Sequence, residues 1–258
     1  MNFKVATPIS TLFQKASSAQ MGKILSLSDV LEERDRGIAC ESDLPRIFHC
    51  ELSVVVKWTE EEINHVAELV RSQKILLVSF HVPSCFEKPL IENGVFVPVG
   101  TRIREEEMLK NAKKNVADLR KIIGNKVEVA IENNNYFKTG AYESVCEPPF
   151  QTALCEHIPC ALLLDIGHAE ISARHMGTAL NEYIVGLPLD KVRQIHLSGI
   201  TRGEKENKDS HEALNELDWK QFADILPLCP NLGHVTIEYY KEPTVLIKML
   251  QKLRIYQI

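Results

Sequence analysis

Short apolar runs, rich in Val, Ile and Leu, recur along the chain and alternate with longer amphipathic stretches. Runs of this kind are typical of parallel strands that are buried on both faces. Eight such strands are predicted, at residues 3–8, 24–29, 46–49, 75–81, 127–133, 161–165, 192–197 and 234–239. The apolar, β-branched residues 52–58 would naturally extend the third of these strands.

Helical patterns separate the predicted strands. Residues 59–73 open with a capping box of Thr59 and Glu62, and residues 102–123 carry apolar side chains at intervals of three and four. Further helices are predicted at residues 149–157, 178–185, 218–226 and 242–253. This repetition predicts an α/β fold, a (β/α)₈ TIM barrel forming a single domain over residues 1–258, with an open doubly wound sheet as the alternative. The polar residues 198–216 are predicted to be a long loop.

Composition narrows the classes of function. The formal net charge of −5 gives no general attraction to nucleic acid, and no long basic run compensates for it. No apolar stretch reaches the roughly 18–20 residues of a membrane span, and the first residues lack a signal-peptide pattern. The seven cysteines are an odd number without CxxC spacing, which indicates reduced thiols. A soluble, cytoplasmic protein with no nucleic-acid or membrane partner is therefore expected.

Imidazole and carboxylate side chains stand at or just beyond the ends of the predicted strands. In a barrel the C-terminal ends of the strands meet at one mouth. A single residue of this kind could be a buried polar group or a helix cap, but five apolar runs that all end in one are poorly explained by such separate roles. The candidate ligands are His49, His81, Glu132, Asp165, His168, His196, Asp209, His211 and Glu238. A single catalytic zinc takes about three protein ligands, so these nine residues predict a multinuclear metal centre.

Local spacing adds detail to this set. The strand is expected to end at Asp165, and Gly167 would let the chain turn so that Asp165 and His168 both face the mouth. Asp209 and His211 lie two residues apart, on the same side of an extended segment, which suits chelation of one ion. Glu132 could bridge two cations, and the amides that follow it could orient ligands or form a polar turn.

These residues, with their DxxH and DxH pairs, resemble the trinuclear constellation of endonuclease IV and other xylose-isomerase-like barrels. The segments LLLDIGHAEISA, EYIVGLPLDKVRQIHLSG, DSHEALNELDW and IENNNYF resemble the multinuclear non-haem iron-dependent oxidative enzymes of the methanobactin-biosynthesis oxidase type. The resemblance implies three ligand groups with Glu132 as a bridge: His49, His81 and Glu132; Glu132, Asp165, His196 and Glu238; and His168, Asp209 and His211.

The same resemblance implies a peptide-modifying oxidoreductase. Its cofactors would be two or three metal ions, with iron favoured and zinc or manganese as alternatives, and dioxygen would be the co-substrate. Its substrate would be a cysteine-containing, ribosomally made precursor peptide. Any protein that presents this peptide is expected to be a separate polypeptide.

Three other functions are compatible with the pattern. A metal-dependent phosphodiester hydrolase of endonuclease IV type could use the same ligands, but it must attract DNA, and the acidic charge balance disfavours that. A sugar isomerase or epimerase of this barrel class usually needs one or two divalent ions, fewer than nine ligands would hold. A non-enzymatic scaffold that binds metal or peptide is the third.

Overall fold

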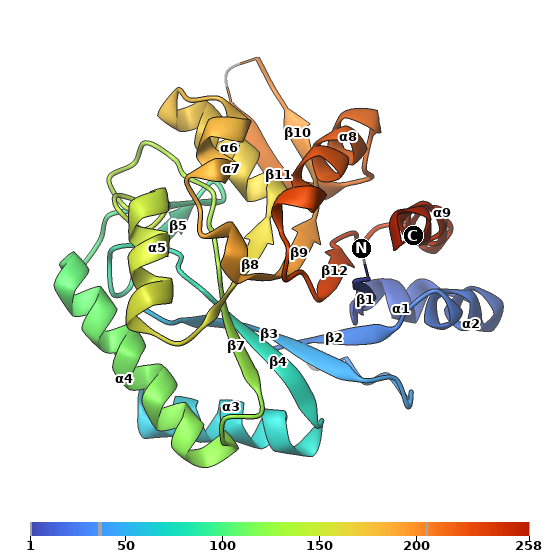
Figure 1. The fold of residues 1–258 in the computed structure, drawn as a ribbon, viewed down its shortest axis with the longest axis horizontal. Helices are drawn as coiled ribbons and strands as arrows, with labels where there is room; N and C mark the ends of the chain where they lie inside the picture. Colours follow the sequence, from blue (N-terminus) through green and yellow to red (C-terminus); the bar gives the residue numbers. More distant parts are fainter. Residues whose placement is uncertain (1, 36–37, 205, 258) are drawn as a thin grey trace.

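Parallel strands of the chain close into a barrel with helices around it, as the computed structural model shows for residues 2–35, 38–204 and 206–257 (Figure 1). Each barrel strand pairs with its neighbours in sequence order, and the last strand returns to the first. The barrel strands are Lys4–Pro8 (β1), Val30–Arg34 (β2), Arg46–Ser53 (β3), Ile75–His81 (β4), Glu128–Glu132 (β7), Ala161–Asp165 (β8), Val192–Leu197 (β9) and His234–Ile237 (β12). The predicted TIM barrel is confirmed.

Helices and two small hairpins complete the described part of the fold. The helices are Thr11–Lys15 (α1), Ser18–Ser26 (α2), Glu60–Ser72 (α3), Glu105–Ile123 (α4), Pro148–His157 (α5), Ile166–Met176 (α6), Leu180–Val185 (α7), Glu216–Ile225 (α8) and Pro243–Arg254 (α9). Antiparallel hairpins are formed by Leu90–Glu92 (β5) with Val95–Val97 (β6), and by Gly199–Arg202 (β10) with Asn207–Glu212 (β11). Among the described residues, no helix combines the length and apolarity needed to cross a membrane.

The inside of the barrel has an apolar layer and, above it, a polar layer. Side chains alternate between the two faces of a strand, so residues two apart point the same way. The apolar layer is a separate cluster of buried residues: Ala6, Val30, Ile47, Leu77, Ala130, Ala161 and Leu163. Two residues further along four of these strands come buried polar groups, Glu32, His49, Glu132 and Asp165. Strand register therefore places a ring of charged and imidazole groups at the C-terminal end of the barrel.

Several local predictions need correction. The second strand is not at residues 24–29, because Ser17 and Gln20 form a capping box that starts α2, and the strand follows at Val30–Arg34. Residues 198–216 are not one loop, because β10 and β11 pair within them and α8 begins at Glu216. The third strand does continue beyond residue 49, to Ser53. The capping box of Thr59 and Glu62 is confirmed.

Gly167 is required for close packing rather than for a turn. Helix α6 starts directly after β8, and Gly167 lies in its first turn. A Cβ atom at this position would lie 2.6 Å from Ser198 Oγ and 2.9 Å from Ile200 Cγ2. The missing side chain therefore allows α6 to pack against the segment that leads into the β10–β11 hairpin.

We expect the substitution Gly167→Ala to lower the free energy of unfolding by about 1–3 kcal/mol, because the added methyl group overpacks this contact. The matched control is Gly22→Ala in α2, where nothing lies within 4 Å of the added atom. That control should be neutral or slightly stabilising, since alanine is the better helix former. Urea unfolding of both variants measures this difference, and equal stability of Gly167→Ala and the unaltered protein would contradict the packing argument.

Candidate metal centre

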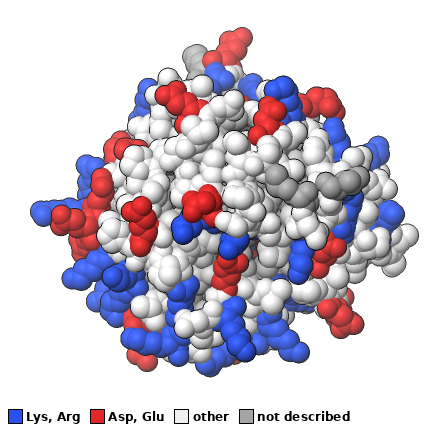
Figure 2. Space-filling model, viewed as in Figure 1, with Lys and Arg blue, Asp and Glu red and all other residues white. Residues whose placement is uncertain are grey.

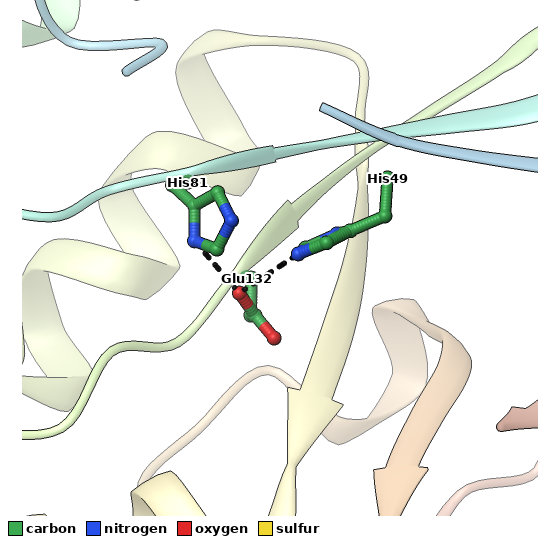
Figure 3. A group of neighbouring side chains, drawn as sticks. All are labelled: His49, His81 and Glu132. Carbon is green, nitrogen blue, oxygen red and sulfur yellow. Dashed lines mark ion pairs between the residues drawn. The ribbon is translucent and has the colours of Figure 1, made fainter. Parts of the chain in front are cut away.

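The carboxylate of Glu132 lies among imidazole rings from three other strands. Its Oε2 atom is 2.9 Å from His81 Nδ1 and 3.6 Å from His49 Nε2, and the two rings point toward it (Figure 3). Its Oε1 atom is 3.2 Å from His196 Nδ1. Glu132 is 2% exposed, so these contacts are made away from bulk water. A carboxylate that bridges two cations needs further ligands near each of its oxygens, and the histidines beside Glu132 have this arrangement.

Glu238 extends the cluster on the β12 side. Its Oε1 atom is 3.4 Å from His196 Nδ1, and its Oε2 atom is 3.7 Å from His211 Nδ1. Tyr240 donates a hydrogen bond to Oε1 at 3.1 Å. Glu238 therefore connects the buried His196 with His211, which comes from the β10–β11 hairpin.

Asp165, His168 and Asp209 form the third side of the cluster. Asp165 caps α6 by accepting a hydrogen bond from the His168 backbone N–H at 2.7 Å, so the helix start fixes the spacing of this pair. His168 Nδ1 donates to the backbone oxygen of Asn133 at 2.9 Å, and its Nε2 lies 3.3 Å from Asp209 Oδ2. His211 Nδ1 is 3.7 Å from the other oxygen of Asp209.

All nine residues singled out from the sequence thus lie in one connected cluster. Three sets of donor atoms are close enough to share an ion, with all atoms of a set within 4.8 Å: His49, His81 and Glu132; Glu132, Asp165 and His168; and Glu32, His196 and Glu238. The first set matches the group expected from the resemblance. The expected second group is divided between the other two sets, with Asp165 beside His168, and with His196 and Glu238 beside Glu32.

Glu32 and Arg34 belong to the site and were missed in the sequence. Glu32 is fully buried, with His196 Nε2 3.0 Å from its Oε2 atom. The guanidinium of Arg34 forms ion pairs with both Glu32 and Glu238. A signal was present, because Val30 and Leu31 precede Glu32 as a short apolar run that ends in a carboxylate. Placing the second strand six residues too early concealed it.

Burial and close charges shift several pKa values. Burial raises the pKa of Glu132, but the nearby His49 and His81 outweigh it and hold that pKa well below its usual range. Burial lowers the pKa of His196, but Glu238 and Glu32 raise it well above the ordinary histidine value. Burial raises the pKa of Asp165 to about 6, against the opposing effect of His168. Without an ion, Glu132 is therefore paired with charged imidazoles at His81 and His196, while burial and Arg34 hold the pKa of His49 well below its ordinary value.

Salt bridges hold the β10–β11 hairpin in position against two helices. Arg202 in β10 makes a two-pronged contact with Glu170 of α6, at 2.6 and 2.7 Å, and also pairs with Asp218 of α8. Arg174 of α6 donates to Asn207 at the start of β11, at 2.7 Å. These contacts hold the segment that carries Asp209 and His211 next to His168.

The donor atoms fit metal ions. Six buried carboxylate and imidazole atoms of the cluster have no hydrogen-bond partner among the described residues, although all lie near opposite charges: Glu32 Oε1, His81 Nε2, Glu132 Oε2, His196 Nδ1, Asp209 Oδ1 and His211 Nδ1. Leaving a buried polar atom without a hydrogen bond costs about 1–3 kcal/mol, so such atoms mark places where a further partner binds. Imidazole nitrogen and carboxylate oxygen are ligands that suit iron, manganese and zinc.

Solved structures similar to this chain are xylose-isomerase-like TIM barrels. A D-tagatose 3-epimerase-like protein aligns with a TM-score of 0.63 and 14% identity, over 98% of this chain and 97% of that one. A xylose isomerase-like TIM barrel protein from Mycobacterium smegmatis, in complex with magnesium, aligns with a TM-score of 0.63 and 13% identity, over 99% and 97% of the two chains. At this identity the likeness shows the fold alone.

Sequence comparison gives the family. Residues 42–247 match the family described as RiPP precursor modification enzyme MbnB/TglH/ChrH, and the chain belongs to that family. RiPPs are ribosomally made peptides that are modified after synthesis. A UPF0276 protein of Caulobacter vibrioides is 35% identical over 82 residues, which cover 32% of this chain and 29% of that protein. The chain thus matches less than a third of the length of this relative.

We expect metal affinity to rise with pH between about 6 and 8. The raised pKa values of His168 and His196 mean that both rings carry an extra proton near neutral pH when no metal is bound, and each ligating ring must lose it. Zinc titration by calorimetry in buffers of different ionisation enthalpy should therefore show proton release. The exposed His65 on α3 provides the control, since His65→Ala should leave the released protons unchanged. Zinc affinity that does not change with pH, together with no proton release, would contradict the assignment of His168 and His196 as ligands.

We expect Arg202→Ala to weaken any zinc binding that depends on Asp209 and His211 by about tenfold or more, as loss of groups that orient ligands typically does. Zinc binding by His49, His81 and Glu132 should keep its affinity, because these three residues are on barrel strands. Lys208→Ala is the control, since its ion pair with Glu206 lies on the exposed side of the same hairpin. Zinc titration separates the positions, and uniform loss at all of them would rule out a local effect of the hairpin.

Proposed function

We propose that this protein is a metal-dependent oxidase that uses iron and dioxygen to modify cysteine residues of a ribosomally made precursor peptide. The observation that carries the proposal is the Glu132 carboxylate, which contacts His81, His196 and His49 from three different strands at 2.9, 3.2 and 3.6 Å. Membership of a family of RiPP precursor modification enzymes supports a peptide as the substrate.

In this proposal the ligands are the nine residues singled out from the sequence. His49, His81 and Glu132 would hold one ion, Glu132 with Asp165, His196 and Glu238 a second, and His168, Asp209 and His211 a third. When bound, iron with an open coordination position supplies electron transfer to dioxygen and a site for a substrate thiolate. Dioxygen is the oxidant, and the cysteine segment of the peptide supplies the electrons.

Differences in exposure indicate where the peptide approaches. The side chains of His81 and His211 are 21% and 32% exposed, whereas His196 is completely buried. The accessible parts of the cluster are therefore at His81 and at His211, and a cysteine side chain would approach the bound ions there. On the face drawn in Figure 2, Lys and Arg side chains lie next to Asp and Glu side chains around much of the edge.

The proposed reaction requires both iron and dioxygen. Protein loaded with iron under anaerobic conditions, and incubated with cysteine-containing candidate precursor peptides, should change the mass of its substrate peptide only after air is admitted. Mass spectrometry of the peptide measures this. The same turnover without dioxygen would exclude an oxidase, and turnover by metal-free or zinc-loaded protein would exclude iron.

Substitution of one proposed ligand should reduce activity and metal content together. We expect Asp165→Ala and His211→Ala each to lower turnover by at least about tenfold and to retain less iron, because each removes a proposed ligand. Asp118→Ala is the control, since Asp118 lies on α4 and pairs with Lys114 and Lys121 away from the cluster. Elemental analysis provides the second measurement. Full iron content in both ligand variants would contradict the assignment.

A further inference from the structure

Glu32 is a buried carboxylate that accepts hydrogen bonds at one oxygen and pairs with a guanidinium at the other. Its Oε2 atom accepts hydrogen bonds from His196 Nε2 and Thr236 Oγ1, both at 3.0 Å, and from the side-chain amide of Gln194. Its Oε1 atom forms the ion pair with Arg34. The donors come from β2, β9 and β12, so strand register fixes the position of the carboxylate at the base of the polar layer.

His196 has two different nitrogen environments. Its Nε2 atom faces Glu32, while its Nδ1 atom faces Glu132 and Glu238 at 3.2 and 3.4 Å and has no hydrogen-bond partner among the described residues. The amide nitrogen of Gln194 also lies 3.0 Å from Nε2, but an amide N–H cannot accept a proton. Glu32 is therefore the acceptor that the Nε2–H group and the Gln194 amide share.

We propose that Glu32 is a positioning residue, which keeps the proton of His196 on Nε2 and so presents the lone pair of Nδ1 to the metal ion. The inference rests on the metal-dependent function proposed above. A neutral imidazole has one N–H group and one ligating nitrogen, and a carboxylate that accepts from the N–H fixes the ring and makes the other nitrogen a better ligand.

Arg34 explains why Glu32 acts through His196 rather than as a ligand itself. Oxygen atoms of Glu32 lie within 4.8 Å of ligand atoms of His196 and Glu238, so direct coordination is the competing role. However, Oε2 already accepts three hydrogen bonds, and the guanidinium that pairs with Oε1 and with Glu238 is a permanent positive charge. A second cation beside Glu32 would have to displace Arg34, which is costly for a charge buried in a low dielectric.

The orientation of His196 can be measured in the unaltered protein. In zinc-loaded protein labelled with ¹⁵N, long-range proton–nitrogen spectra should show that His196 has a protonated Nε2 and a metal-bound Nδ1. The reverse pattern, with zinc on Nε2, would overturn the proposal without any substitution. Protein that binds no zinc at all would instead contradict the metal centre, so failure of this inference and failure of the proposed function are distinguishable.

The substitution Glu32→Gln tests the same point through affinity. It keeps the size of the side chain and removes its charge, and we expect zinc affinity at one position to fall about 10- to 100-fold while the number of ions bound at saturation stays the same. The matched control is Glu33→Gln on the same strand, because Glu33 pairs with Arg46 outside the cluster. That variant should bind zinc within about twofold of the unaltered protein.

Two results of this substitution would overturn the proposal. Loss of one whole ion at saturating zinc in Glu32→Gln would make Glu32 a ligand. Unchanged affinity, with thermal melting that shows a folded protein, would remove any role for Glu32 in positioning His196. Should the variant not fold, the nitrogen spectra of the unaltered protein still decide which nitrogen of His196 binds zinc.

Discussion

The site depends on the burial of one carboxylate among imidazoles. Glu132 is almost completely inaccessible, and moving an ionised carboxylate out of water costs several kcal/mol unless positive charge compensates for it. In this protein the compensation comes from His81 on the neighbouring strand β4 and from His196 on β9, whose pKa values are both raised. The C-terminal ends of barrel strands converge at one mouth, so the fold itself brings these groups to Glu132.

The alternation of side-chain direction along each strand explains how the barrel accommodates such a cluster. Apolar residues such as Ile47 and Ala130 fill one layer of the interior, and the next inward positions on the same strands are His49 and Glu132. The apolar layer is close-packed and leaves no space for the polar side chains, so these side chains stay at the mouth of the barrel. Arg34 and Glu32 balance the charge on the far side of His196, and the hairpin carrying Asp209 and His211 covers the remaining side.

The barrel predicted from the sequence is confirmed, and the nine residues singled out as ligands lie close together, because both predictions depend on short apolar runs that end in an imidazole or carboxylate residue. Their role as metal ligands stays a prediction. Prediction from the sequence fails where a local signal competes with that pattern. Residues 24–29 are as apolar as a strand, but the capping box at Ser17 starts a helix that includes residues 24–26. Because the strand was predicted too early, Glu32 was not recognised as a strand-end carboxylate. The β10–β11 hairpin has few apolar residues, and salt bridges of Arg202 hold it in place. No apolar run therefore predicts its two strands. The role of Gly167 depends on Ser198 and Ile200, contacts between segments that no local pattern reveals.

Anomalous X-ray diffraction from crystals of the iron-loaded protein, grown without oxygen, tests the central claim most directly, because it locates each iron ion relative to its ligands. Two or three peaks around the Glu132 carboxylate, one of them beside His196 Nδ1, are predicted. A single peak elsewhere, or none within coordination distance of Glu132, would contradict a multinuclear centre built on this carboxylate.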